Sequence, residues 1–224
     1  MDKKAYREII LLLSIVTVIV LSAVIYVRAF QWYMVANNFG LENTHLDWQN
    51  VPLEQPVTTI PQAVAAVEKV AKDWDKRAML ANFSMYFDTP QDVKDLKADF
   101  HVDYSFIWHE PLTGAYRQDG HLMAGILRNS SEIEYVSATM GGILTVSDEV
   151  LDLSGHILTV EDVPRIMNRV YGEDWAEKYG DIRLRVEILS DYWSFEFYSD
   201  VTKERHYLYV NPFTGDIMSI KAMK

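Results

Sequence analysis

The longest apolar segment of the chain is Ile9–Val27, nineteen residues without a charged side chain. A helix rises about 1.5 Å per residue, so this segment would cover roughly 28 Å, close to the thickness of the hydrocarbon core of a bilayer. Basic residues flank it on both sides: Lys3, Lys4, Arg7 and Arg28. The pattern predicts that residues 1–30 form a short cytoplasmic start and a single transmembrane helix.

The flanking residues predict the orientation of this helix. The basic start favours an N-terminus in the cytoplasm by the positive-inside rule, which places the rest of the chain outside. Aromatic side chains suited to the membrane interface lie near its outer end: Tyr26, Phe30, Trp32 and Tyr33. The alternative is a cleaved secretory signal, whose apolar core is about 7–15 residues long and ends at a small-x-small site. The longer core and the bulky residues after it favour a retained signal anchor.

The next segments alternate between irregular, helical and strand-like patterns. Residues 31–58 show no sustained period and predict a juxtamembrane stalk. Thr59 is expected to cap an amphipathic helix whose apolar positions recur at helical spacing. Residues 99–108 then alternate strictly, which predicts a strand with one apolar face. Further strands are expected near residues 79–87, 121–127 and 133–139, so residues 59–147 form a first α+β unit.

Residues 148–224 repeat this order of helix and strands. An apolar stripe begins at Thr159, and Thr159 with Asp162 fits a capping box. In a helix that begins at Thr159, Pro164 would lie beyond the first turn, where proline is disfavoured. The first turn is therefore expected nearer Asp162. Strands are expected at 183–189, 193–198, 206–210 and 216–220. The sequence therefore predicts the α+β class, with two tandem units of a helix and an antiparallel sheet.

A short motif links the two halves. The pattern Pro-x-Thr-Gly occurs twice at an offset of 101 residues, as Pro111, Thr113 and Gly114 and as Pro212, Thr214 and Gly215. Trp74 and Trp175 share this offset. The common spacing predicts an internal duplication. Pro fixes its own φ and Gly permits a positive one, so both motifs are expected to be structural turns between strands.

The segment 159–220 resembles the PepSY family of small extracytoplasmic domains. The resemblance lies in the Thr-x-x-Asp start of the helix and in the closing hairpin Tyr207-Leu-Tyr-Val-Asn-Pro-Phe-Thr-Gly-Asp-Ile-Met. Asn211 and Asp216 depart from the usual Asp-Pro-x-Thr-Gly-Glu. Residues 59–146 share this resemblance only through the internal duplication marked by the repeated Pro-x-Thr-Gly motif. The resemblance implies a PepSY- or cystatin-like fold and a protein-binding envelope module without catalytic residues, and some members of the family are thought to restrain peptidases.

Charge and cysteine content exclude several classes of function. Of 21 basic and 32 acidic residues, four and two precede Gln31, which leaves 17 and 30 and a net charge of −13 for the rest. Such a surface repels phosphate backbones, so nucleic-acid binding is not expected. The chain has no cysteine, which excludes disulfides, thiolate metal sites and lipid attachment to cysteine. A large extracytoplasmic domain without disulfides favours a bacterial envelope.

No motif predicts catalysis, a cofactor or a metal. His101, His109 and His121 with Asp103 and Glu110 invite a metal hypothesis, and His101 and Asp103 would project from one strand face. However, no third ligand follows from the spacing, and surface histidines explain them better. A nucleophile elbow, a phosphate loop and a dinucleotide fingerprint are all missing.

The remaining candidate is a protein interface. Tyr198, Tyr207 and Tyr209 are expected on the outward face of the second sheet, and exposed tyrosines are typical of interfaces. The sequence predicts a non-catalytic, membrane-anchored accessory or scaffolding subunit that binds a protein partner in the cell envelope. The alternative is an inhibitor or regulator of an extracytoplasmic peptidase. An enzyme with an unrecognised site would need convergent acids in a deep pocket.

Overall fold

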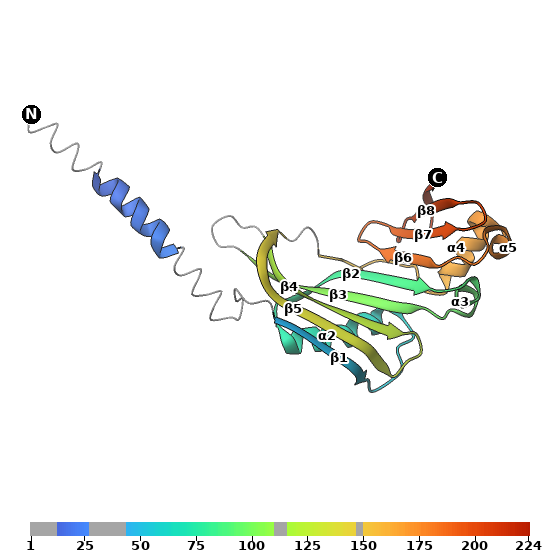
Figure 1. Cartoon of the computed structure of the whole chain (residues 1–224), viewed down its shortest axis with the longest axis horizontal. Helices are drawn as coiled ribbons and strands as arrows, with labels where there is room; N and C mark the ends of the chain where they lie inside the picture. Colours follow the sequence, from blue (N-terminus) through green and yellow to red (C-terminus); the bar gives the residue numbers. More distant parts are fainter. Residues whose placement is uncertain (1–12, 27–43, 110–115, 147–149) are drawn as a thin grey trace, which may run out of the picture. The chain divides into compact units, whose positions relative to one another are not determined.

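The computed structural model describes residues 13–26, 44–109, 116–146 and 150–224 (Figure 1). The chain divides into two compact units, one with Met1–Asn43 and Met140–Gly142 and the other with Thr44–Thr139 and Ile143–Lys224. In the first unit, the described residues 13–26 are helical. Among the described residues, no helix has the length and apolar character required to span a membrane. Phe30, Trp32 and Tyr33 lie outside the described residues.

The second unit is an α+β body, as predicted, and contains nine strands in the described part of the chain. Its first elements are β1 (Thr44–Pro52), α2 (Ile60–Trp74), β2 (Ala78–Phe87), α3 (Pro90–Asp95), β3 (Asp99–His109), β4 (Tyr116–Leu127) and β5 (Glu132–Val146). The later elements are α4 (Asp162–Tyr171), α5 (Trp175–Tyr179), β6 (Leu184–Ile188), β7 (Trp193–Ser199), β8 (Glu204–Val210) and β9 (Ile217–Met223).

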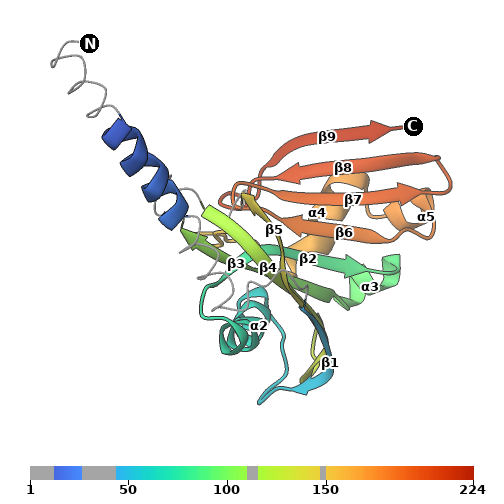
Figure 2. The same ribbon diagram turned by 60° about the vertical axis from the view of Figure 1, so that its left-hand side comes forward.

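All nine strands belong to one sheet, in the order β1-β5-β4-β3-β2-β6-β7-β8-β9 (Figure 2). The strands of the two predicted α+β units therefore form one continuous sheet. They meet where β2 pairs antiparallel with β6, with Phe83 opposite Ile188. From this seam β2–β5 and β6–β9 each run outward in sequence order, and each series follows a helix. The two halves thus correspond by a rotation about an axis perpendicular to the sheet.

The repeated Pro-x-Thr-Gly motif does not mark equivalent turns in the two halves. Residues 111–114 fall between β3 and β4, outside the described residues, whereas residues 212–215 lie between β8 and β9. By strand order, the β8–β9 connection corresponds to the β4–β5 connection. The offset of 101 residues therefore aligns two different connections, although both halves do place an amphipathic helix before a run of four strands.

The turn between β8 and β9 is built around Asn211. Its side-chain Oδ1 accepts hydrogen bonds from the backbone N–H groups of Phe213 (2.8 Å) and Thr214 (3.1 Å). Gly215 follows with a φ of 75°, a conformation that favours glycine, and its N–H bonds to the Asn211 carbonyl at 2.8 Å. An aspartate could accept the same two bonds, which explains why Asn211 can replace the Asp of the family pattern.

The two amphipathic helices begin differently. α2 opens after Thr59, as predicted, and the structure adds a capping box between Thr59 and Gln62. Before α4, the Thr159 N–H donates to the Asp162 carboxylate at 2.7 Å, but the helix itself starts at Asp162. The first turn of α4 therefore includes Pro164, as the position of this proline predicted.

The prediction of an irregular stalk over residues 31–58 is wrong for β1, which adds an edge strand beside β5. The short helices α3 and α5 also had no periodic signal, since six and five residues are too few to show one.

Both amphipathic helices cover the same face of the sheet. One buried row runs in register across five strands: Val102, Phe83, Ile188, Trp193 and Val210. Two residues along β3 from this row, the Tyr104 hydroxyl donates to the Val64 carbonyl of α2 at 3.1 Å. On β7, four residues from Trp193 of this row, Phe197 packs against aromatic rings of α4 and α5. The core is thus a single layer between one sheet face and the helices.

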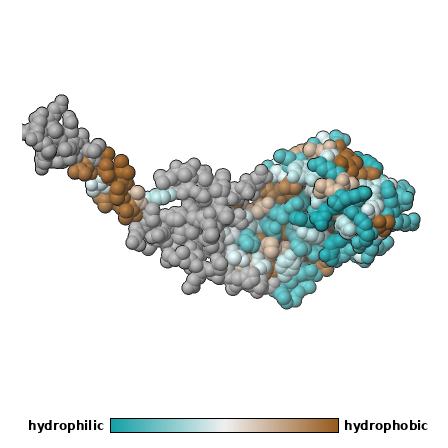
Figure 3. Space-filling view, turned by 45° about the horizontal axis from the view of Figure 1, so that its top comes forward, coloured by the Kyte–Doolittle hydropathy of each residue, from teal (hydrophilic) through white to brown (hydrophobic). Residues whose placement is uncertain are grey.

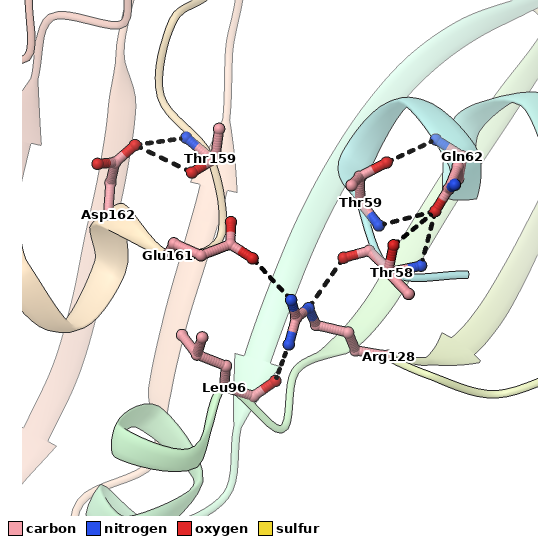
Figure 4. Close-up of polar contacts among 8 residues, drawn as sticks. All are labelled: Thr58, Thr59, Gln62, Leu96, Arg128, Thr159, Glu161 and Asp162. Carbon is pink, nitrogen blue, oxygen red and sulfur yellow. Dashed lines mark hydrogen bonds and ion pairs between the residues drawn. The ribbon is translucent and has the colours of Figure 1, made fainter. Parts of the chain in front are cut away.

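Arg128, in the turn after β4, connects both halves of the body (Figure 4). Its Nε donates to the Thr58 carbonyl before α2 at 2.9 Å, and one terminal nitrogen donates to the Leu96 carbonyl after α3 at 3.3 Å. The other terminal nitrogen forms an ion pair of 2.7 Å with Glu161, just before α4. The Arg128 side chain is 13% exposed, so one guanidinium ties three helix ends together.

His206 lies in an aromatic cluster between the second half of the sheet and its helices. The residue is 5% exposed, and its ring stacks on Phe197 with centroids 4.7 Å apart. The rings of Tyr171 and Tyr179 approach edge-on at 5.8 and 4.9 Å. Burial among these rings lowers the pKa of His206.

Because the pKa of His206 is lowered in the folded state, the unfolded chain binds a proton more readily. The free energy of unfolding should therefore fall as the pH drops from above about 6.5, the unfolded pKa, and level off below the folded pKa. Lys178 adds to the lowering, whereas Glu204, 3.8 Å from Nε2, partly opposes it. Urea unfolding at about pH 8 and pH 5.5 measures the loss. It should be smaller in His206→Phe, and an equal loss in both proteins would contradict the role of His206.

Candidate functional site

The face of the sheet opposite α2, α4 and α5, here called the open face, carries polar and aromatic side chains. One row crosses six strands in register: Asp99, Tyr86, Arg185, Glu196, Tyr207 and Lys221. Opposite charges lie next to each other on β6 and β7, which stabilises the strand pairing. In the described part of the body, neither amphipathic helix packs on this face.

The three tyrosines predicted as an interface do share the open face. Tyr207 and Tyr209 are two residues apart on β8, and Tyr198 on β7 lies opposite Arg205. Tyr198 is 45% exposed, and the other two are half-buried. The structure adds Tyr192, whose ring meets that of Tyr209 at 5.5 Å.

A shallow hollow of about 290 Å³ lies on the open face beside the seam between β2 and β6. Its lining includes Tyr86, Arg183, Arg185, Glu196, Tyr198 and Arg205. The Arg185 guanidinium lies 5.9 Å from the centre of the Tyr86 ring, and Arg205 pairs with Glu196 at 2.9 Å. The sequence does not reveal this group, because its members come from separate strands. Only the spacing of two between Arg183 and Arg185 signals a shared face.

A chain of hydrogen bonds joins three other side chains on the open face. Tyr135 Oη lies 3.1 Å from His101 Nδ1, and His101 Nε2 lies 3.1 Å from Asp99 Oδ2. A neutral imidazole protonated at Nε2 satisfies both contacts, since the tyrosine then donates to Nδ1.

The order carboxylate, imidazole and hydroxyl is that of a catalytic relay. However, burial, together with the carboxylates of Asp99 and Asp103, raises the pKa of Tyr135 to about 12. The hydroxyl therefore stays protonated at neutral pH and can donate to His101.

The candidate metal ligands do not converge. His101 and Asp103 share a strand face as expected, and Asp103 accepts a bond from Asn82 at 3.2 Å. His121 lies on β4 opposite Ser105. The side chain of His109 and all of Glu110 lie outside the described residues. Among the residues that the structure does describe, no group of three or more His, Asp or Glu side chains could hold a metal ion.

A larger hollow of about 430 Å³ lies between residues 51–57 and the outer side of α2. Its lining is mainly apolar and includes Val51, Leu53, Pro56, Ala66 and Val70. Its ion pair, Lys69 with Glu54 at 3.8 Å, is largely exposed to solvent. Nothing in this hollow resembles a set of polar groups that converge on a substrate.

These features define an α+β protein with a continuous antiparallel sheet, one face under helices and one open. No family model and no curated protein sequence matches the chain. The structure is similar to the crystal structure of a "putative lipoprotein" from Clostridium difficile 630, with a TM-score of 0.42 and 14% identity. That match covers 79% of this chain and 100% of the other. The resemblance of residues 159–220 to PepSY domains thus stays a prediction from the motif.

Proposed function

We propose that this protein is a non-catalytic, single-pass membrane protein that binds a protein partner through the open face. In this proposal the N-terminus is cytoplasmic, the body lies outside the cytoplasm, and the chain is an accessory or scaffolding subunit of a membrane or envelope complex. The observation that carries the proposal is the concentration of tyrosine and arginine on a sheet face that neither α2 nor α4 covers. These residue types are enriched at protein interfaces and at their energetic hot spots.

The surface composition supports a membrane anchor beside a hydrated body. Figure 3 shows the described N-terminal helix as an apolar segment, whereas the visible surface of the body is mostly hydrophilic. Along that helix, large apolar residues such as Leu13, Ile19 and Ile25 are 59–67% exposed. Exposed apolar side chains on all sides suit a lipid environment better than water.

The interface prediction is tested by purifying the full-length protein from its native membranes. We expect that Tyr198→Ser with Tyr207→Ser weakens the captured complex roughly 10-fold or more, since each hot-spot residue contributes above about 1 kcal/mol. The control is Lys72→Ala on the exposed side of α2, which should retain the partner. Equal capture by both variants would contradict the open-face interface.

The same experiment distinguishes the second candidate function. The closing hairpin from Tyr207 to Met218 resembles that of PepSY domains, some of which are thought to restrain peptidases. If the captured partner is a peptidase and its activity falls on addition of the full-length protein, the chain is a peptidase regulator. If the partner has no such activity, the scaffolding role is supported.

The orientation prediction uses the absence of cysteine from the chain. A single cysteine at Val201, which is 63% exposed in the body, should react with a membrane-impermeant maleimide on intact cells. A single cysteine at Lys3 should react only after the membrane is permeabilised. The reverse labelling pattern would place the body in the cytoplasm and refute the proposed location.

A further inference from the structure

Three arginines converge on the shallow hollow of the open face beside the seam between β2 and β6. Arg183 directly precedes β6, Arg185 lies on β6, and Arg205 lies on β8. The lining also includes one acidic side chain, Glu196, so these described residues give the hollow a net charge of +2. The sequence from Gln31 onward carries −13. The hollow is therefore a local positive patch on an acidic body, and such a patch selects anionic groups.

The ion pairs already present at the hollow leave the arginines able to bind another anion. Arg183 pairs with Asp88 at 2.8 Å and Arg205 pairs with Glu196 at 2.9 Å, and more than half of each arginine side chain is exposed. Exposed pairs of this kind contribute little to stability. A guanidinium has five N–H donors, so each arginine keeps donors for a second carboxylate.

Arg185 is the arginine whose donors are least satisfied. One terminal nitrogen donates to Glu187 at 3.1 Å, whereas Nε is buried and has no hydrogen-bond partner in the described part of the chain. A buried donor without a partner costs free energy. A carboxylate that approaches an arginine side-on accepts bonds from Nε and a terminal nitrogen together. The Arg185 side chain is 37% exposed, so it can turn toward such a ligand.

We infer that this hollow receives the carboxylate of an aspartate or glutamate side chain of the partner protein. The inference rests on the proposed function, because aspartate and glutamate are the anionic side chains with which a protein can fill a positive hollow. Tyr86 and Tyr198 lie in the same lining. At about 290 Å³, the hollow is at the lower limit of ligand pockets, which measure about 300–1,000 Å³. Its size therefore suits single side chains of a partner better than a large free ligand.

Binding of hexaglutamate to the full-length protein in non-ionic detergent tests this inference by calorimetry at low salt. We expect a dissociation constant on the order of 0.1–1 mM. Arg185→Gln with Arg205→Gln should weaken binding at least roughly 10-fold. The matched control is Lys72→Gln with Arg165→Gln, which also removes two positive charges and two ion pairs, but from α2 and α4. This control should bind the peptide as the wild type does.

Two further variants separate the recognition of the carboxylate from effects on folding. Arg185→Lys with Arg205→Lys keeps the charge and loses the planar fork, so its affinity should fall between those of the wild type and the glutamine variant. Arg183→Gln changes a side chain that is 71% exposed and should weaken binding roughly 3-fold while the protein stays folded. Thermal melts check the folding of every variant.

The outcomes distinguish this inference from the proposed function. No binding of hexaglutamate to the wild type, or an equal loss in the matched control, would overturn the inference. Displacement of the peptide by an equal concentration of inorganic phosphate would assign the hollow to phosphate and overturn it as well. If capture from native membranes depends on Tyr198 and Tyr207 but not on Arg185 and Arg205, the proposed function stands and the inference fails. If the wild type binds hexaglutamate but captures no protein, the proposed function fails and the carboxylate site remains.

Discussion

Replacement of Arg128 by alanine is expected to lower the free energy of unfolding by about 2–4 kcal/mol, measured by urea unfolding at neutral pH. The guanidinium bonds to the carbonyl groups of Thr58 and Leu96 and to the Glu161 carboxylate. Alanine leaves two part-buried carbonyls without these partners, and hydrogen bonds to a charged group contribute more than neutral ones. It also removes a link between segments 33 and 70 residues apart in sequence.

The matched control is Glu161→Gln, which keeps the shape of the side chain and removes its charge. Glu161 is 53% exposed, so its ion pair contributes little, and we expect a loss below about 1 kcal/mol. Arg128→Lys should fall between the two, because one ammonium cannot reach three acceptors in different directions. If Arg128→Ala costs no more than Glu161→Gln, the two carbonyl contacts do not stabilise the body.

Replacement of Gly125 by alanine is expected to displace the ring of Tyr135 and to cost about 1–3 kcal/mol of stability. A Cβ atom at Gly125 would lie 2.2 Å from Cε1 of Tyr135, well inside van der Waals contact. The ring can move away only if Tyr135 gives up its 3.1 Å contact with His101. Thermal or urea unfolding measures the cost, and a crystal structure or the His101 resonances would show the lost contact.

A double-mutant cycle separates the clash from a backbone effect at Gly125. In a Tyr135→Ala background the ring is absent, so Gly125→Ala should change stability by less than about 0.5 kcal/mol or stabilise the strand slightly. An equal cost in both backgrounds would show that Gly125 is required for its own backbone and not for the aromatic ring across the strand pair.

The sequence predicted the elements with the clearest period. The helix starting after Thr59 and the alternating strand over residues 99–108 appear where expected, because each places a full apolar face against the core. β1 was missed because an edge strand is held mainly by backbone pairing and shows little periodicity. The helices α3 and α5 were missed because they are too short to show a helical period. Ala63, buried in α2, was also overlooked, because alanine contributes little to an apolar pattern.

The candidate site was only partly predictable. Tyr198, Tyr207 and Tyr209 were placed together because alternation along a strand fixes which residues share a face. The hollow lined by Arg183, Arg185 and Arg205 could not be predicted, because it forms only when β6, β7 and β8 lie in register beside β2. The same holds for the contact between His101 and Tyr135, which are 34 residues apart.

The sequence by itself determined the α+β class, the apolar N-terminal segment, the two amphipathic helices and the polar side of the strands that alternate. These properties follow from local periodicity and from the chemistry of single residues. Only the tertiary structure decided that β2 and β6 join both halves into one sheet, that Arg128 links three helix ends and that β9 is left at the edge. Such pairings depend on backbone register between distant segments, and hydrogen bonds between backbones carry no sequence signature of their own.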